Sequence, residues 1–309
     1  MDRSFFQHLP QEIDIVWDEP RDDFDFYQKA SKYDGIVCRT RQIRSEPFKR
    51  TGIGKLKCIA RAGAGLDDID VDFFEKKGVS VLRVPEGNQD SLAEHTMAML
   101  LAIMHRLLPA HESLRQERWE REKHRGMELK NKNVGIIGYG YMGSAFARRL
   151  RSFGCRILAY DKYKEGYAPR YVEELNLKTL LEQAQIISLH VPLSPETHHM
   201  VDEVFLRTWR NPLVLLNTSR GKVVHMVHLK EAMEGENLFA AGLDVFPKEP
   251  PIQLSLQEKN AFKYLCGHPR VLLSPHVAGW SSESWIRTSR FLERKLKKFF
   301  QNLKTMEKI

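Results

Sequence analysis

The sequence predicts an α/β protein built on doubly wound parallel sheets. Short apolar runs alternate with helical stretches from Val134 onward in this 309-residue chain. That alternation is typical of parallel strands joined by helices that cover both faces of a sheet. A glycine-rich turn also follows the first of these runs, at Gly138, where strand pattern gives way to helix pattern.

The alternation supplies the strands of the larger sheet. The runs are Val134–Ile137, Arg156–Tyr160, Ile186–Leu189, Leu213–Leu216, Ala240–Leu243 and Val271–Leu273. Polar side chains suited to chemistry or binding follow nearly every run: Asp161, His190, Asn217 to Arg220, Asp244 and His276. Ligands bind outside the carboxyl ends of strands in open parallel sheets, so we expect these side chains to converge on one crevice.

The glycine turn has the spacing G-x-G-x-x-G at Gly138, Gly140 and Gly143. The first glycine allows a tight turn, the second lets the backbone approach a pyrophosphate, and the third lets helix and strand pack closely. Asp161 stands 18 residues past Gly143, where it can accept hydrogen bonds from ribose hydroxyls and repel a 2′-phosphate. The stretch predicts an NAD site rather than an NADP site. The alternative is a glycine-rich turn in another kind of α/β domain.

A smaller α/β unit precedes this turn. Its strand-like runs are Ile13–Val16, Gly35–Cys38, Cys58–Arg61 and Val79–Leu82. One long helix from Leu92 to about Gln116 is expected to link the two units. Its apolar residues cover more than one face, so it must be buried on two sides. A second subunit explains the second buried side best, and we expect a homodimer.

Composition favours an ordinary globular protein in the cytoplasm. The chain has 42% hydrophobic and 28% charged residues. Its most apolar stretch is interrupted by charged or titratable side chains, so no membrane partner is expected: Glu94, His95, His105 and Arg106. The cysteines show neither metal nor redox spacing, so we expect free thiols and no metal: Cys38, Cys58, Cys155 and Cys266.

A net charge of +8 raises nucleic acid as an alternative partner. Much of the basic excess, however, lies on one face of an amphipathic helix that begins at about Ser281. A solvated helix face explains that charge, and no nucleic-acid partner is expected.

Three side chains after the predicted strands suit hydride-transfer chemistry. His276 has the side-chain type whose pKa lies nearest neutrality, as a proton donor to a carbonyl requires; the alternative is a structural loop histidine. Arg220 can grip a carboxylate with its planar guanidinium, or form a surface ion pair. Glu249 can hold the imidazole in one tautomer, or be a solvated loop acid. Together, beside a nicotinamide, they predict a site for a 2-hydroxy or 2-keto acid.

Five blocks in order resemble the D-isomer-specific 2-hydroxyacid dehydrogenases over essentially the whole chain. They are Arg61–Asp70, Pro85–His95, the glycine turn, Asn217–Gly221, and Glu249-Pro250 with Ser274-Pro275-His276. The resemblance implies an NAD-dependent oxidoreductase. It implies that Arg220 binds substrate and that Glu249 and His276 form the acid–base pair.

The resemblance also implies further contacts. The backbone N–H groups around Ala64 and Gly65 are expected on the substrate carboxylate, and Asp244 near the nicotinamide carboxamide. The residues expected to contact cofactor are Gly138, Gly140, Tyr141, Met142, Gly143, Asp161, His190, Thr218 and Asp244. A flavodoxin-like substrate domain, residues 1–92 plus 283–309, is expected to flank an inserted Rossmann NAD-binding domain, residues 93–282.

Within the family, motif details lean toward D-3-phosphoglycerate dehydrogenases. The matching segments are Arg61-Ala62-Gly63, Trp119–Lys123 and Gly126–Leu129, together with Arg39. Arg39 and Arg61 would add positive charge for a phosphate. Glyoxylate, hydroxypyruvate or another D-2-hydroxy acid remains an alternative substrate, and a non-enzymatic NAD(H)-sensing corepressor-like binder remains an alternative function.

Two departures from the family pattern bear on these expectations. Arg83 stands where the family often has asparagine, and its charge could reach substrate, cofactor or neither. The family's first strand is expected to be absent, which would leave a sheet edge unprotected. No C-terminal regulatory domain is expected.

Overall fold

The computed structural model describes residues 9, 13–18 and 20–306. The chain divides into two compact units, and each is described by itself. The large unit is Gln89–Trp280, and the small unit combines Met1–Asn88 with Ser281–Ile309.

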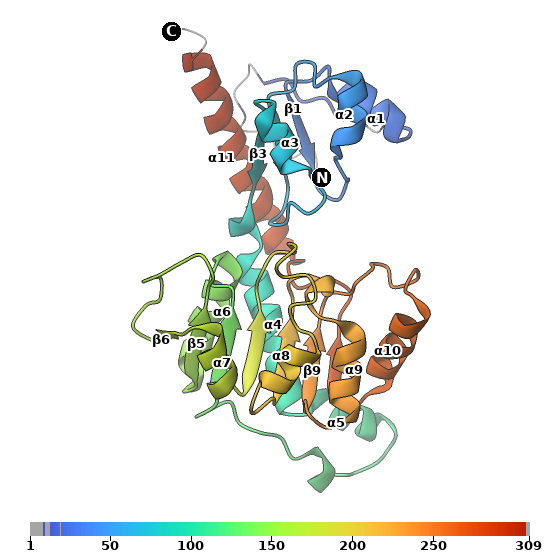
Figure 1. Ribbon diagram of the computed structural model, residues 1–309, viewed down its shortest axis with the longest axis vertical. Helices are drawn as coiled ribbons and strands as arrows, with labels where there is room; N and C mark the ends of the chain where they lie inside the picture. Colours follow the sequence, from blue (N-terminus) through green and yellow to red (C-terminus); the bar gives the residue numbers. More distant parts are fainter. Residues whose placement is uncertain (1–8, 10–12, 19, 307–309) are drawn as a thin grey trace. The chain divides into compact units, whose positions relative to one another are not determined.

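A seven-stranded, wholly parallel sheet organises the large unit, in the order β10-β9-β8-β7-β4-β5-β6 (Figure 1). The strands are β4 Asn133–Ile137, β5 Arg156–Tyr160, β6 Val172–Glu174, β7 Ile186–Leu189, β8 Val214–Asn217, β9 Ala240–Leu243 and β10 Val271–Leu273. Every strand predicted from Val134 onward is present. The sequence did not reveal β6, because three residues with two glutamates carry no readable apolar pattern.

Helices cover both faces of this sheet, and the predicted doubly wound α/β fold is confirmed. They are α4 Gln89–Met104, α5 Leu107–Arg115, α6 Tyr141–Leu150, α7 Leu177–Gln183, α8 Glu203–Thr208, α9 Met226–Glu234 and α10 Leu256–Gly267, with short 3-10 turns at η3 Glu122–His124, η4 Arg151–Phe153 and η5 Gly221–Val223. Each of β7, β8 and β9 is buried along its whole length. Such continuous burial requires packing on both faces.

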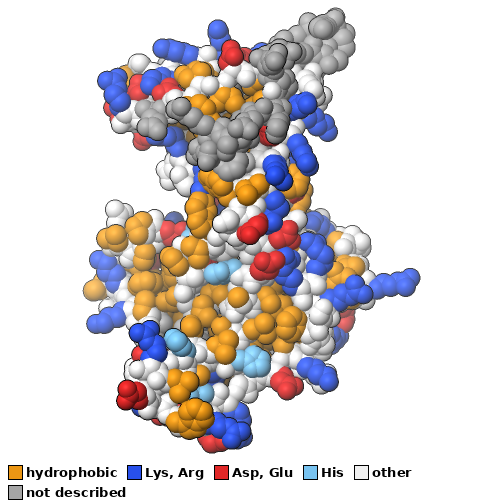
Figure 2. Space-filling view, turned by 180° about the vertical axis from the view of Figure 1, so that it is seen from behind, with side chains coloured by type: hydrophobic (Ala, Val, Ile, Leu, Met, Phe, Trp, Pro, Cys, Tyr) orange, Lys and Arg blue, Asp and Glu red, His pale blue; other side chains and the backbone are white. Residues whose placement is uncertain are grey.

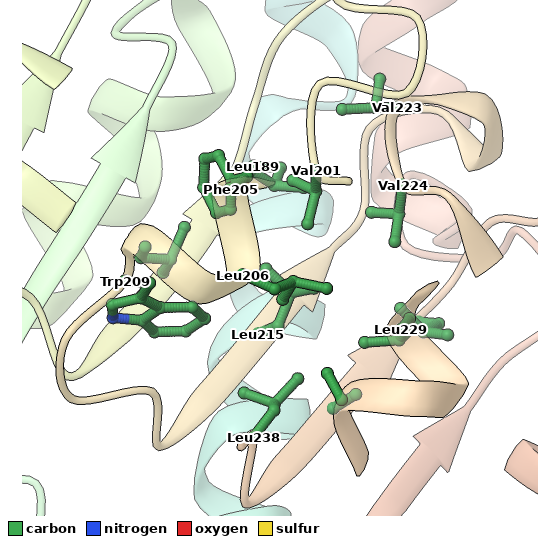
Figure 3. Close-up of a cluster of buried hydrophobic side chains, with 14 of the residues drawn as sticks. Leu189, Val201, Phe205, Leu206, Trp209, Leu215, Val223, Val224, Leu229 and Leu238 are labelled. Atoms are coloured by element: carbon green, nitrogen blue, oxygen red, sulfur yellow. The ribbon is translucent and has the colours of Figure 1, made fainter. Parts of the chain in front are cut away.

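Two hydrophobic cores lie against the sheet. One includes residues of α4 and α6, such as Met104 and Phe146. The other joins α8 and α9 to the strands, and Figure 3 shows its side chains clustered around Leu206, Leu215 and Leu229. The indole of Trp209 is buried there and donates a hydrogen bond of 2.7 Å to the backbone oxygen of Ala184. The buried indole N–H is therefore satisfied.

Side-chain caps set the starts of several helices. Asn176 accepts from the backbone N–H of Thr179 ahead of α7, and Asp202 accepts from that of Phe205 ahead of α8. Ser255 forms a capping box with Glu258 at α10. Each cap satisfies N–H groups that have no partner within the helix.

The predicted single helix from Leu92 to Gln116 is wrong, because it breaks into α4 and α5. Arg106 lies between them with φ +52°, a left-handed conformation that ends a right-handed helix. The backbone oxygen of Met104 accepts from Met127 N–H at 2.8 Å. Gly126 makes this approach possible, since a Cβ there would lie 2.8 Å from His105 Cα. A distant segment thus satisfies the carbonyl that a continuing helix would use.

The small unit contains a parallel sheet in the order β1-β2-β3 within the described residues. Its elements are α1 Asp23–Ala30, β1 Gly35–Cys38, α2 Ser45–Thr51, β2 Cys58–Arg61, α3 Val71–Lys76, β3 Ser80–Arg83, the 3-10 turn η2 Pro85–Gly87 and α11 Ser282–Met306. The predicted strand at Ile13–Val16 is wrong: this segment is irregular. Ile15 and Val16 stay exposed, so no buried face fixes a register there.

The C-terminal helix α11 packs within the small unit. Leu292 and Leu296 join a buried cluster with Cys58 and Ala60 of β2. All four cysteines are free thiols, with Cys38 and Cys58 buried, Cys155 half-buried and Cys266 exposed.

Candidate active site

The glycine turn lies between β4 and α6, as its spacing predicts. Gly138 has φ +91°, and a Cβ there would lie 2.6 Å from the backbone oxygen of His190. A Cβ on Gly143 would lie 2.1 Å from the oxygen of Gly138, so helix and turn could not pack as they do. At Gly140 a Cβ would meet nothing within 4 Å. Gly138 and Gly143 therefore shape the turn, while Gly140 leaves space in front of it.

The helix that follows begins within this motif. Gly140 is the residue before α6, with Tyr141 and Met142 in its first turn, and no side chain caps it. The free N–H groups and the helix dipole suit an anionic group. The side chain of Tyr141 is exposed.

Asp161 follows β5 and is largely buried, with 12% of its side chain exposed. Its carboxylate accepts from the backbone N–H of Tyr139 at 2.9 Å and of Tyr163 at 3.1 Å. An ionised carboxylate can accept about four hydrogen bonds, so capacity remains for ribose hydroxyls. These bonds also attach the strand end to the glycine turn.

Two further predicted cofactor residues lie at neighbouring strand ends. His190 follows β7, and its Nε2 lies 2.9 Å from Ser188 Oγ, while its Nδ1 is buried without a partner in the described structure. Burial lowers the pKa of His190 to about 3, so its imidazole is neutral. Thr218 is buried after β8, with its hydroxyl 3.1 Å from that of Thr96.

These residues fit a dinucleotide. The open space at Gly140, the uncapped helix start and the acid at the next strand end are the features that a pyrophosphate and a ribose require. Among the described residues, no group of three or more His, Cys, Asp or Glu side chains could hold a metal ion.

His276 and Glu249 are in direct contact, through a hydrogen bond between His276 Nδ1 and Glu249 Oε2. The other carboxylate oxygen accepts from Phe246 N–H at 2.9 Å. Half of the His276 side chain is exposed, so its ring can meet a ligand. A backbone N–H thus holds Glu249 in place, while the ring of His276 remains accessible to a ligand.

The contact shifts the two pKa values in opposite directions: that of His276 is raised and that of Glu249 is lowered. The hydrogen bond that His276 donates to Glu249 raises the pKa of His276 above its usual value, against desolvation and the charge of Arg220. Burial alone would raise the pKa of Glu249, but hydrogen bonds from His276 and Phe246 N–H, with the charge of Arg220, lower it. A carboxylate that stabilises imidazolium keeps the ring available as a proton donor near neutral pH.

Arg220 lies close enough to both members to shift their pKa values. The buried Asn217 shapes its turn, accepting from Ser219 N–H at 3.0 Å and donating to the oxygen of Arg220 at 3.0 Å. A Cβ on Gly221 would lie 1.9 Å from the carbonyl carbon of Phe246. This close approach joins the turn of Arg220 to the segment that carries Glu249.

Asp244 is a residue whose main contacts the sequence did not reveal. Its side chain is 1% exposed. Its oxygens accept from Ser274 Oγ at 2.5 Å and from the backbone N–H groups of Val277 at 2.9 Å and Ala278 at 2.8 Å. The sequence predicts a contact of Asp244 with cofactor, and in the structure its bonds also hold the loop that carries His276.

In the small unit, the predicted arginines lie at the carboxyl ends of neighbouring strands. Arg61 pairs in register with both Cys38 and Arg83, and Arg39 directly follows Cys38. The guanidinium of Arg39 lies 4.6 Å from the ring centre of Trp285. Arg61 Nη2 forms an ion pair with Asp68 at 3.0 Å.

The loop after β2 completes this edge. Arg83 Nη1 donates to the oxygen of Ala64 at 3.4 Å, and both Ala64 and Gly65 are half-buried. Burial and the nearby charge of Arg61 lower the pKa of Arg39. The edge is therefore cationic, although Arg61 is already partly neutralised by Asp68.

Comparison with known proteins identifies the family. The model described as D-isomer specific 2-hydroxyacid dehydrogenase, NAD binding domain, matches residues 97–278, more than half of the chain. The chain belongs to this family. The family's NAD-binding domain therefore lies within the large unit.

Relatives of this chain within the family are named for different substrates. Hydroxypyruvate reductase of Thermotoga maritima is 36% identical over 242 residues, which is 78% of this chain and 76% of that protein. D-3-phosphoglycerate dehydrogenase of Bacillus subtilis is 31% identical over 280 residues, 90% of this chain but 51% of that protein. The chain therefore spans about half the length of that phosphoglycerate dehydrogenase.

A solved structure supports the same family. D-lactate dehydrogenase from Aquifex aeolicus, complexed with NAD and lactic acid, matches with a TM-score of 0.81 at 28% identity, covering 89% of this chain and 85% of that one. Within the described residues, no helix is both long and apolar enough to cross a membrane.

Proposed function

We propose that this protein is an NAD-dependent oxidoreductase that transfers a hydride between nicotinamide and a D-2-hydroxy acid or its 2-keto acid. The contact between His276 and Glu249, with Arg220 close by, is the observation that carries the proposal. All three lie in the unit that contains the glycine turn. We assign the large unit to cofactor binding and the small unit to substrate binding.

His276 acts as the general acid in carbonyl reduction. Its protonated ring donates to the carbonyl oxygen, and its neutral ring accepts that proton back in the oxidative direction. Bound NADH supplies the hydride. Glu249 stabilises the imidazolium, and Arg220 binds the substrate carboxylate and polarises the adjacent carbonyl. General acid catalysis of this kind contributes roughly 10²–10⁴-fold in rate.

The preferred substrate carries a second anionic group, as 3-phosphohydroxypyruvate does. The cationic strand ends of the small unit, at Arg39, Arg61 and Arg83, support this choice. The ion pair of Arg61 with Asp68 favours a smaller acid, such as hydroxypyruvate or glyoxylate, as the alternative.

Oxidation of NADH against a panel of 2-keto acids tests both points. The panel contains 3-phosphohydroxypyruvate, hydroxypyruvate, glyoxylate and pyruvate, and His276→Ala purified in the same way controls for contaminating activity. The highest kcat/KM is expected with 3-phosphohydroxypyruvate. Tight NADH binding without turnover of any keto acid would instead favour the NAD(H)-sensing binder.

We also propose a cytoplasmic homodimer. Large apolar side chains stay exposed on α5 and the segment after it: Leu107, Leu108, Leu114 and Trp119, the last 82% exposed. Figure 2 shows apolar side chains gathered over one face of the large unit. Solvated apolar clusters of this kind mark association surfaces. Sedimentation velocity at micromolar concentration should give a dimer, and a monomer would contradict the proposal.

A further inference from the structure

A polar relay joins helix α4 to the loop that carries His276. His95 on α4 has its Nε2 2.9 Å from Ser274 Oγ. That hydroxyl donates to Asp244 Oδ1 at 2.5 Å, and His95 Nε2 lies 3.6 Å from the same oxygen. Because the hydroxyl hydrogen points to the carboxylate, Ser274 Oγ accepts from the N–H at His95 Nε2, which selects the tautomer of this ring.

Asp244 connects this relay to His276 by hydrogen bonds to the backbone of the His276 loop. Its carboxylate holds the N–H groups of Val277 and Ala278, and its backbone oxygen accepts from His276 N–H at 2.7 Å. His276 itself has φ +55°. The left-handed conformation is uncommon for residues other than glycine, and the hydrogen bonds to Asp244 hold the loop in which His276 adopts it.

Helix α4 holds the same loop at a second point. The buried hydroxyl of Ser91, one helical turn before His95, donates to the oxygen of Ala278 at 2.9 Å. The loop from Ser274 to Ala278 is therefore fixed by α4 on one side and by the end of β9 on the other. His276 is the residue in this loop that reaches Glu249.

We propose that His95 is a positioning residue for the reaction: through Ser274 and Asp244 it holds the 274–278 loop in the conformation that directs His276 toward Glu249. This inference rests on the proposed function of His276. His95 transfers no proton to substrate. It donates one hydrogen bond to a relay that ends on a buried carboxylate, and a buried charge that loses a partner is costly.

The charged groups that face His95 and His276 determine how loss of the relay would change the pKa of His276. Asp244 is the acid that faces His95. Glu249, Arg220 and Asp244 face His276. When the loop loosens, the contact of His276 with Glu249 is the interaction that weakens, so the pKa of His276 falls toward its ordinary value of about 6.5.

The test compares His95→Ala with His95→Gln. Glutamine places an amide N–H near the position of Nε2 and should retain the bond to Ser274. We expect His95→Ala to lower kcat about tenfold, the effect of losing one hydrogen bond to a polar network, with KM for NADH unchanged. His95→Gln should remain close to wild type.

The dependence of activity on pH distinguishes a positioning role of His95 from a loss of activity through partial unfolding. Carbonyl reduction needs protonated His276, so activity falls as pH rises through its pKa. His95→Ala should move that alkaline limb to lower pH, whereas partial unfolding would scale the whole profile without moving the limb. Ser274→Ala removes one oxygen and should shift the limb in the same direction, which keeps the test usable if His95→Ala does not fold.

A matched control lies in the same unit. His124 Nε2 lies 2.8 Å from Ser113 Oγ, which donates to Glu120 at 3.1 Å. His124→Ala removes a similar histidine–serine–carboxylate contact at α5 and η3, and it should leave the limb in place.

NMR titration of the imidazole carbon-bound proton of His276, assigned with His276→Gln, gives a readout independent of turnover. A lower His276 pKa in His95→Ala, restored in His95→Gln, supports the relay even if no keto acid is reduced, in which case only the proposed function fails. An unchanged His276 pKa in His95→Ala would overturn the inference.

Discussion

His190 and His276 both follow strands of the same parallel sheet, yet their surroundings move their pKa values in opposite directions. His190 is enclosed beside Gly138 and Phe146, and burial lowers its pKa to about 3. His276 is half exposed, and its hydrogen bond to Glu249 raises its pKa. The position after a strand brings a histidine to the site, but the neighbouring acid or its absence decides whether the ring can carry a proton.

The strongest test of this comparison removes the ring of His276. His276→Ala should lower kcat roughly 10²–10⁴-fold, because the general acid is lost. NADH affinity, measured by fluorescence titration, should stay nearly unchanged, since the glycine turn and Asp161 are untouched. Retained turnover would contradict the assigned role.

A smaller effect should follow from removing the charge of Glu249. In Glu249→Gln the amide no longer stabilises imidazolium, so the raised pKa of His276 falls. We expect kcat at pH 7.5 to fall about tenfold and the alkaline limb of reduction to move to lower pH. A limb that stays in place would show that Glu249 does not set the pKa of His276.

His190 should influence stability more than catalysis. Its pKa is about 6.5 when unfolded and is lowered to about 3 in the fold. Between these values the unfolded chain binds the extra proton, so the free energy of unfolding falls as pH falls. The slope is about 1.4 kcal/mol per pH unit.

His190→Phe isolates this contribution. It should flatten the dependence between pH 6 and pH 4, measured by urea unfolding, while the pH limb of turnover stays unchanged. An equal slope in wild type and His190→Phe would contradict the buried, neutral state of this histidine.

The glycine turn and most strands could be predicted from the sequence, because each depends on residues that are close together along the chain. The spacing of Gly138, Gly140 and Gly143 predicted a turn between strand and helix, and the apolar runs predicted β4, β5 and the strands from β7 to β10. Periodicity could not show the break at Arg106, because a segment some twenty residues later supplies the bond to Met104 that ends the helix. Ile13–Val16 had a strand pattern but lacked a buried face.

The sequence by itself determined where most strands lie along the chain, where the glycine turn lies, and which side chains follow the strand ends. Tertiary structure alone decided which of those side chains meet. His95 lies 179 residues from Ser274, and Asp244 lies 30 residues from it. Their bonds form only when parallel strands bring their carboxyl ends together beside α4, because no local pattern encodes a contact between residues so far apart along the chain.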